Sequence, residues 1–96
     1  MIRVLIAEDS PLIATMMRDL LGQEPEIGVV GWAKNGQEAI KLTNSLQPDV
    51  ITMDLNMPVL GGLEAIKTIT SIRRTPILVI SQMIESQDSD LAFEAL

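Results

Sequence analysis

Short apolar runs alternate with segments of helical periodicity along the 96 residues of the chain. The apolar runs predict four strands, at residues 2–7, 27–33, 49–53 and 77–81. A first helix is expected after Ser10, an N-cap residue that precedes Pro11, and a second after Asn35, which resembles the start of a capping box. Further helical patterns follow Gly61-Gly62 and cover residues 85–96.

Strands that alternate with helices at this spacing predict βαβ units. The strands carry near-continuous apolar runs, which are typical of a parallel sheet that is buried on both faces. The expected fold class is therefore α/β, a doubly wound parallel sheet with helices on both sides. Met16, Met17 and the isoleucine stripe of the third helix are expected to lie in the core.

The last predicted strand raises a question about its edge. A sheet of four strands leaves the apolar residues 77–80 without a neighbour on one side, and such an edge favours pairing with another chain. We infer that the chain is a fragment or that something outside it covers this edge. We also expect the uncovered fourth strand to promote self-association.

Composition and charge narrow the function classes. The net charge of −6 and the absence of a basic stripe argue against direct binding to nucleic acid or to an anionic membrane. There is no cysteine, no apolar segment approaches the length of a membrane span, and no signal peptide is visible. These features fit a protein of the cytoplasm.

Acidic side chains follow two of the predicted strands. Glu8 and Asp9 close the first strand and Asp54 closes the third, while Ser81 ends the fourth. In a doubly wound sheet the carboxyl ends of the strands line the ligand site. Carboxylates that are crowded there need a counter-charge, and an all-oxygen donor set without histidine or cysteine favours Mg²⁺. A carboxylate beside such a metal is a candidate nucleophile toward a phosphoryl group.

The stretches "VLIAEDSP", "VITMDLNMPVLGGLEAI" and "PILVIS" occur in this order along the chain. They resemble the receiver domain of bacterial two-component response regulators, over the whole chain. The stretches "EIGVVGWAKNGQEAI" and "QPDVITMDLNMP" are most similar to the receivers of chemotaxis methylesterases. The resemblance implies the flavodoxin-like receiver fold, here a single receiver domain over residues 1–96.

The resemblance also implies roles for individual residues. It makes Asp54 the phosphoacceptor, and Asp9, Asp54 and the backbone carbonyl of Asn56 the direct ligands of Mg²⁺. Glu8 takes the outer acidic position, with contact to the metal through water. Ser81 becomes the switch hydroxyl.

Two departures from the family pattern stand out. The lysine that the family carries on a fifth strand is missing, together with that strand and the last helix, so the domain is incomplete at its C-terminus. None of Lys34, Lys41 and Lys67 is expected to replace this lysine. Gln82, after the switch hydroxyl, is bulkier than the usual residue of the family and could hinder access to Asp54.

The function that the resemblance implies is that of a phosphoacceptor signalling domain. It would take a phosphoryl group from a sensor histidine kinase and switch a partner surface or a C-terminal methylesterase domain. Pro58 and Gly61 or Gly62 would shape the turn after the phosphorylation site. The chain has no histidine, so it cannot build a Ser-His-Asp triad, and we do not expect this segment to be an enzyme.

Two alternatives remain open. A truncated receiver could serve only as a binding or dimerisation module, because the distal lysine is missing. A haloacid-dehalogenase-like phosphatase also uses an aspartyl nucleophile and Mg²⁺, but it needs a second aspartate two positions later. That position holds Asn56, which disfavours this alternative.

Overall fold

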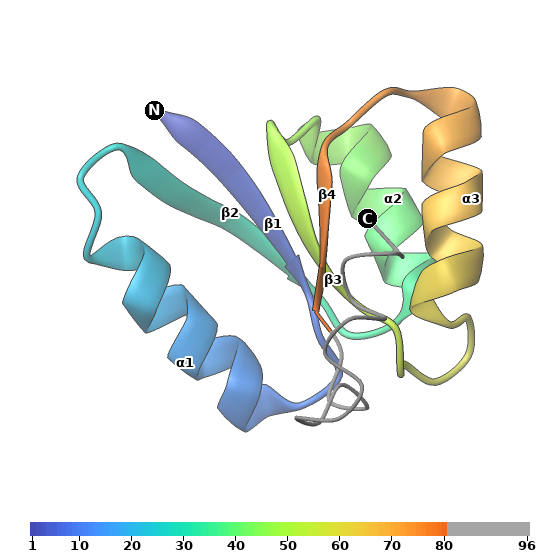
Figure 1. Cartoon of the computed structure of the whole chain (residues 1–96), viewed down its shortest axis with the longest axis horizontal. Helices are drawn as coiled ribbons and strands as arrows, with labels where there is room; N and C mark the ends of the chain where they lie inside the picture. Colours follow the sequence, from blue (N-terminus) through green and yellow to red (C-terminus); the bar gives the residue numbers. More distant parts are fainter. Residues whose placement is uncertain (81–96) are drawn as a thin grey trace, which may run out of the picture.

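The computed structural model describes residues 1–80 (Figure 1). The predicted helix at residues 85–96, the switch hydroxyl of Ser81 and the side chain of Gln82 lie outside the described residues. In chain order the elements are β1 (Ile2–Ala7), α1 (Pro11–Gly22), β2 (Ile27–Ala33), α2 (Gly36–Leu46), β3 (Val50–Asp54), α3 (Gly62–Ile72) and β4 (Ile77–Ile80).

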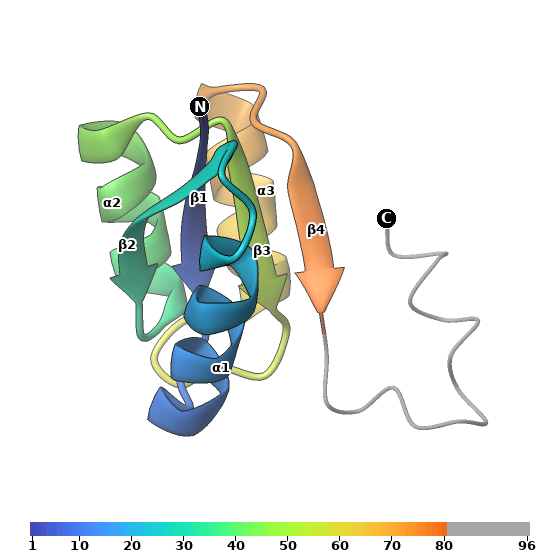
Figure 2. The same cartoon turned by 90° about the vertical axis from the view of Figure 1, so that its left-hand side faces the viewer.

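The four strands form one parallel sheet in the order β2-β1-β3-β4. Helix α1 covers one face of the sheet, and α2 and α3 cover the other (Figures 1 and 2). The central pair β1 and β3 aligns Ala7 with Met53, so both strands end at the same edge of the sheet. The α/β doubly wound fold is therefore confirmed.

Side chains define the starts of the first two helices, as the sequence predicts. Ser10 Oγ accepts a hydrogen bond from the Ile13 amide at 3.3 Å, and Asn35 Oδ1 accepts one from the Glu38 amide at 2.8 Å. Helix α2 ends where Gln47 adopts a left-handed conformation with φ of 49°, a conformation that asparagine or glycine more often supplies. The two N-caps fix where the loops after β1 and β2 enter α1 and α2.

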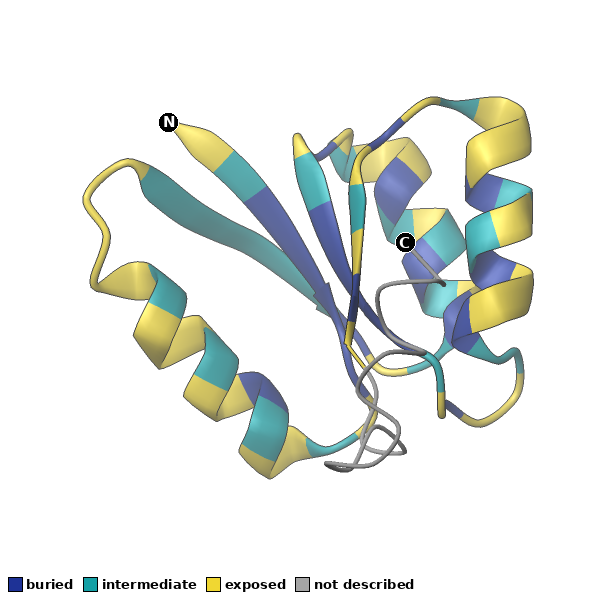
Figure 3. Cartoon of the chain, in the orientation of Figure 1, coloured by how far each residue is buried: buried dark blue, intermediate teal, exposed yellow. Residues whose placement is uncertain are grey.

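The core has two parts, one on each face of the sheet. The larger part lies under α2 and α3, and the smaller part lies under α1 where it crosses β1 and β2 (Figure 3). Leu5 and Ile51 of the two central strands are fully buried in the larger part, and Ile6 anchors the smaller one. Burial of both faces of β1 and β3 explains why their sequences are apolar without alternation.

The expected core positions on α1 need a correction. Met17 is half-buried against the sheet, but Met16 is 55% exposed, and Leu20, one turn later, is exposed as well. The reason is that α1 crosses only β1 and β2, so no element within residues 1–80 covers this flank of the helix. In α3, Ile69 is buried but Ile72, at the end of the helix, is exposed.

Strand β4 forms one edge of the sheet within the described residues. Its side chains alternate: Val79 is buried toward the larger core, while Leu78 and Ile80 are 48% and 36% exposed. The uncovered edge that the sequence predicts is thus present among residues 1–80. No helix in this part of the chain is long and apolar enough to cross a membrane.

Candidate functional site

Three carboxylates meet where β1 and β3 end. Glu8 and Asp9 directly follow β1, Asp54 is the last residue of β3, and one carboxylate oxygen from each lies within 4.8 Å of the others. The two strands are direct neighbours with parallel register, which brings together residues that are 45 positions apart in the sequence. The structure therefore assembles the acidic cluster that the sequence predicts.

Asp54 is held in place within its own turn. Its side chain is buried, with 3% exposed, and its Oδ1 accepts a hydrogen bond from the Asn56 amide at 3.0 Å. This bond fixes the plane of the carboxylate relative to the loop that follows. The backbone carbonyl of Asn56, expected as a metal ligand, belongs to the same short turn, and its role remains a prediction.

Glu8 is the more buried member of the acidic pair. The β1–β2 ladder continues one residue beyond β1, because the Glu8 amide donates to the Ala33 carbonyl at 2.9 Å. The Glu8 side chain is only 2% exposed, whereas Asp9 is exposed. The expectation that Glu8 reaches a metal through water remains untested by this geometry.

The environment of Glu8 favours its protonated form. Its pKa is raised from 4.5 to about 7, with burial as the largest cause, and the nearby Asp9 and Asp54 contribute to the rise. A hydrogen bond from the Ser10 amide to Glu8 Oε2, at 3.0 Å, acts in the opposite direction. The site thus brings three carboxylates together, and a positive charge beside them would favour the ionised form of Glu8.

A hard divalent cation fits this donor set. The site offers carboxylate oxygens, the chain has neither histidine nor cysteine, and a small cation such as Mg²⁺ needs only a few protein ligands. The raised pKa of Glu8 reflects the electrostatic strain that such a cation would relieve. The residues that are present thus fit Mg²⁺ by charge, donor type and spacing.

Close backbone packing shapes the loop between β3 and α3. A Cβ atom on Gly62 would lie 2.2 Å from the Asp54 carbonyl oxygen, whereas one on Gly61 would come no closer than 3.6 Å to the Leu55 carbonyl oxygen. Gly62 is therefore the glycine that the turn requires. The sequence alone does not indicate which of Gly61 and Gly62 the turn requires, because the answer depends on the path of the loop.

The same loop contains a strained residue. Val59 has φ of 69°, and the Leu60 amide donates to the Pro58 carbonyl across it at 2.8 Å, which closes a γ-turn. A β-branched residue rarely adopts this left-handed conformation. The apolar run around Val59 carries no signal of the positive φ, so the sequence did not reveal this strain.

Trp32 is a further residue that sequence reasoning missed at this edge. Its indole Nε1 donates to the Glu8 carbonyl oxygen at 2.6 Å. Lys34 directly follows β2, and its Nζ lies 5.2 Å from the centroid of the Trp32 ring. Strand β1 separates β2 from β3, so Lys34 stands one strand further from Asp54 than Asp9 does.

The model for the response regulator receiver domain matches residues 4–95. A protein-glutamate methylesterase/protein-glutamine glutaminase from Carboxydothermus hydrogenoformans is 50% identical over 95 residues, and one from Myxococcus xanthus is 48% identical over the same length. These alignments cover 99% of this chain but only 27% of each relative, so the chain spans about a quarter of their length.

Solved structures give the same answer. The response regulator domain of Thermotoga maritima CheB superposes with a TM-score of 0.87 at 38% identity, over 98% of this chain and 72% of that one. A LuxR-family response regulator from Aurantimonas superposes with a TM-score of 0.84 at 32% identity, over 97% of this chain and 67% of that one. By its sequence and by its fold, the chain belongs to the response regulator receiver domain family.

Proposed function

We propose that Asp54 accepts a phosphoryl group from a sensor histidine kinase and that the chain is a phosphoacceptor domain of a chemotaxis-type two-component system. The observation that carries this proposal is the cluster of Glu8, Asp9 and Asp54, whose carboxylate oxygens lie within 4.8 Å of one another at the carboxyl edge of the sheet. Membership of the receiver family and the similarity to methylesterase receivers support the same role.

The proposed step is an in-line transfer between two nucleophiles. A carboxylate oxygen of Asp54 forms a bond to phosphorus while the P–N bond of a phosphohistidine breaks, and the departing imidazole nitrogen keeps the electron pair. The hydrogen bond from the Asn56 amide to Asp54 Oδ1 holds the carboxylate in one orientation during this step. The product is an acyl phosphate on Asp54.

Asp9, Asp54 and the backbone carbonyl of Asn56 would hold Mg²⁺ directly, with Glu8 in contact through water. When bound there, Mg²⁺ would neutralise the charge of the acidic cluster and of the incoming phosphoryl oxygens. Ionised Glu8 would gain from the cation, because burial and the neighbouring carboxylates raise its pKa to about 7. The Ser81 hydroxyl, outside the described residues, would contact a phosphoryl oxygen as the switch residue.

An intact-mass measurement tests the proposal. The protein is incubated with Mg²⁺ and acetyl phosphate, and Asp54→Asn is compared with Asp19→Asn, whose carboxylate lies on the exposed surface of α1. We expect one phosphoryl increment in the wild type and in Asp19→Asn, and none in Asp54→Asn or without Mg²⁺. An increment that persists in Asp54→Asn would refute Asp54 as the acceptor.

The partners follow from the relatives. Methylesterase/glutaminase relatives are about four times as long as the matched segment, and this chain has no histidine for a serine-hydrolase triad. We propose that residues 1–96 act as a receiver domain whose phosphorylation regulates a methylesterase domain C-terminal to it, in the cytoplasm where the kinase resides. The segment itself would carry no esterase activity.

A second candidate is a binding module that associates through β4. This strand is a sheet edge among residues 1–80, with Leu78 and Ile80 exposed on it, and a second copy of the chain could pair with the free edge. Sedimentation at increasing concentration tests this candidate, with Leu78→Lys as the disruptive variant. Concentration-dependent dimers that Leu78→Lys abolishes would support it, and a wild type that stays monomeric at high concentration would exclude it.

A further inference from the structure

Trp32 forms a hydrogen bond with the backbone of Glu8, a member of the acidic cluster that lies 24 residues earlier in the sequence. Its indole N–H donates a short hydrogen bond to the Glu8 carbonyl at 2.6 Å. This carbonyl belongs to the peptide that joins Glu8 to Asp9, so the bond fixes the plane from which the Asp9 side chain departs. Trp32 therefore acts on the exposed acidic residue of the site without belonging to the cluster.

Two other hydrogen bonds restrain the same loop, but neither of them involves the peptide group between Glu8 and Asp9. The Glu8 amide donates to the Ala33 carbonyl, which extends the β1–β2 ladder, and the Ser10 amide donates to the Glu8 carboxylate. These bonds hold the peptide before Glu8 and the residue after Asp9. Within residues 1–80, the bond from Trp32 acts on the peptide between the two acidic residues.

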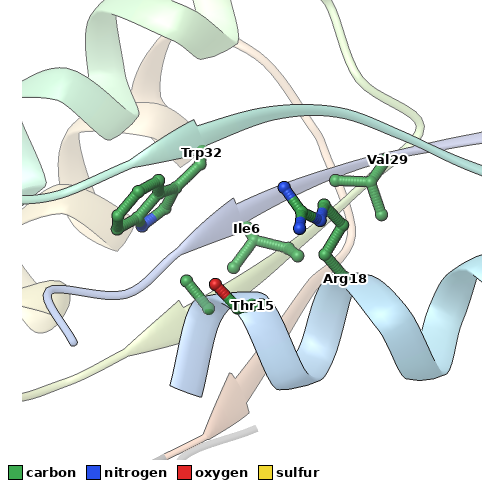
Figure 4. A pocket seen from close by; sticks show the side chains of 6 residues that line it. Ile6, Thr15, Arg18, Val29 and Trp32 are labelled. Carbon is green, nitrogen blue, oxygen red and sulfur yellow. The ribbon is translucent and has the colours of Figure 1, made fainter. Parts of the chain in front are cut away.

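The Trp32 ring borders a cavity and faces the ammonium of Lys34. It forms one wall of a cavity of about 60 Å³ between α1 and the β1–β2 half of the sheet, where Ile6 and Val29 also lie (Figure 4). The Lys34 ammonium lies 5.2 Å from the ring centroid. Both features belong to the ring and its surroundings, so each can be changed without removing the N–H donor to Glu8.

We infer that Trp32 is a positioning residue for the metal site: its N–H group sets the orientation of the Glu8–Asp9 peptide and thereby places Asp9 for a divalent cation. This inference rests on the proposed function, because it presupposes that Asp9 and Asp54 bind Mg²⁺. Groups that orient metal ligands through hydrogen bonds typically change metal affinity by 10- to 100-fold when they are removed. Trp32→Phe keeps an aromatic ring and removes the donor, so we expect Mg²⁺ to bind about tenfold more weakly.

Two variants separate the hydrogen bond from its surroundings. Val29→Ala loosens the packing of the same cavity and leaves the indole donor in place, and Lys34→Met removes the ammonium from the ring. We expect both to bind Mg²⁺ within about twofold of the wild type, since neither touches the Glu8 carbonyl. Unfolding of all three variants in urea without metal shows whether any loss of affinity follows from a loss of stability.

Isothermal titration of Mg²⁺ into the wild type and the three variants is the test, at constant ionic strength. In parallel, Mn²⁺ should broaden the NMR signal of the indole N–H, which is unique because the chain has one tryptophan. A tenfold loss confined to Trp32→Phe supports the inference. Equal affinity in Trp32→Phe, or an equal loss in Val29→Ala, overturns the inference and leaves the metal site standing, whereas a wild type that binds no Mg²⁺ refutes the metal site and with it the inference.

Discussion

A Cβ atom on Gly62 would lie 2.2 Å from the backbone carbonyl oxygen of Asp54, because the first turn of α3 packs directly against the end of β3. The contact involves backbone atoms on one side, so no side chain can move to relieve it. The start of α3 is thus in van der Waals contact with the backbone of the proposed phosphoacceptor. Any side chain at position 62 must displace one of the two elements.

The contact predicts different outcomes for two adjacent glycines. Gly62→Ala should destabilise the fold by about 1–3 kcal/mol through overpacking and should slow phosphorylation of Asp54 by displacing its backbone. Gly61→Ala should change the stability and the phosphorylation rate little, because a Cβ there meets only the Leu55 carbonyl oxygen at 3.6 Å. Urea unfolding and the rate of phosphorylation by acetyl phosphate measure the two effects, and equal behaviour of the two variants would contradict the contact.

The raised pKa of Glu8 predicts a pH dependence of stability. Its pKa is raised in the folded state from 4.5 to about 7, so the folded state binds this proton more tightly than the unfolded state does. Without metal, the contribution of Glu8 to the free energy of unfolding should be full below about pH 4.5. It should then fall by about 3 kcal/mol as the pH rises through 7.

Glu8→Gln provides the control for this effect, because it cannot titrate. The difference in the free energy of unfolding between wild type and Glu8→Gln should change across pH 4.5–7 and stay constant above about pH 8. Saturating Mg²⁺ should remove most of the change, since the cation stabilises the ionised carboxylate. A difference that is independent of pH would show that Glu8 titrates normally.

The left-handed Val59 predicts a stabilising substitution. Val59→Gly relieves a backbone strain of about 1–3 kcal/mol and loses about 0.5–1 kcal/mol through the greater freedom of the unfolded chain. The net gain should be about 1 kcal/mol, and thermal or urea unfolding would detect it. Val59→Ala should give a smaller gain in the free energy of unfolding, because alanine keeps a Cβ atom at positive φ. If Val59→Gly is less stable than the wild type, the positive φ at position 59 is contradicted.

Two buried threonines should respond in opposite ways to the same substitution. Among residues 1–80, the Thr52 hydroxyl on β3 has no hydrogen-bond partner, while the Thr43 hydroxyl on α2 donates to the Ala39 carbonyl at 2.6 Å. Thr52→Val should therefore raise the free energy of unfolding by about 1 kcal/mol, and Thr43→Val should lower it. If Thr52→Val proves clearly destabilising, its hydroxyl must have a partner in the native protein.

The acidic cluster could be predicted from sequence for a simple reason. The carboxyl ends of neighbouring parallel strands meet at one edge, so acidic residues at two strand ends are close whenever those strands pair. The near-continuous apolar runs predicted strands buried on both faces, without indicating which strands pair. Only their adjacency and the 4.8 Å spacing of the carboxylate oxygens had to come from the structure.

Other features depend on packing that the sequence does not encode locally. The burial of Glu8 rather than Asp9 depends on how the end of β1 packs in the sheet, and the proposed role of Trp32 depends on a hydrogen bond from β2 to the loop after β1. The exposure of Met16 depends on which strands α1 crosses, since the helical periodicity alone places it near the apolar face. Each case requires the relative position of elements that are distant in the sequence.

Chemical mapping of the phosphoryl group tests the central claim most directly. After incubation with Mg²⁺ and acetyl phosphate, borohydride reduces an acyl phosphate of aspartate to homoserine, and peptide mass spectrometry then locates the modified residue. We predict homoserine at position 54 and unmodified carboxylates at positions 8 and 9. Homoserine at position 9, the five-carbon alcohol 5-hydroxynorvaline at position 8, or no reduced residue at all in a protein that binds Mg²⁺, would contradict the account.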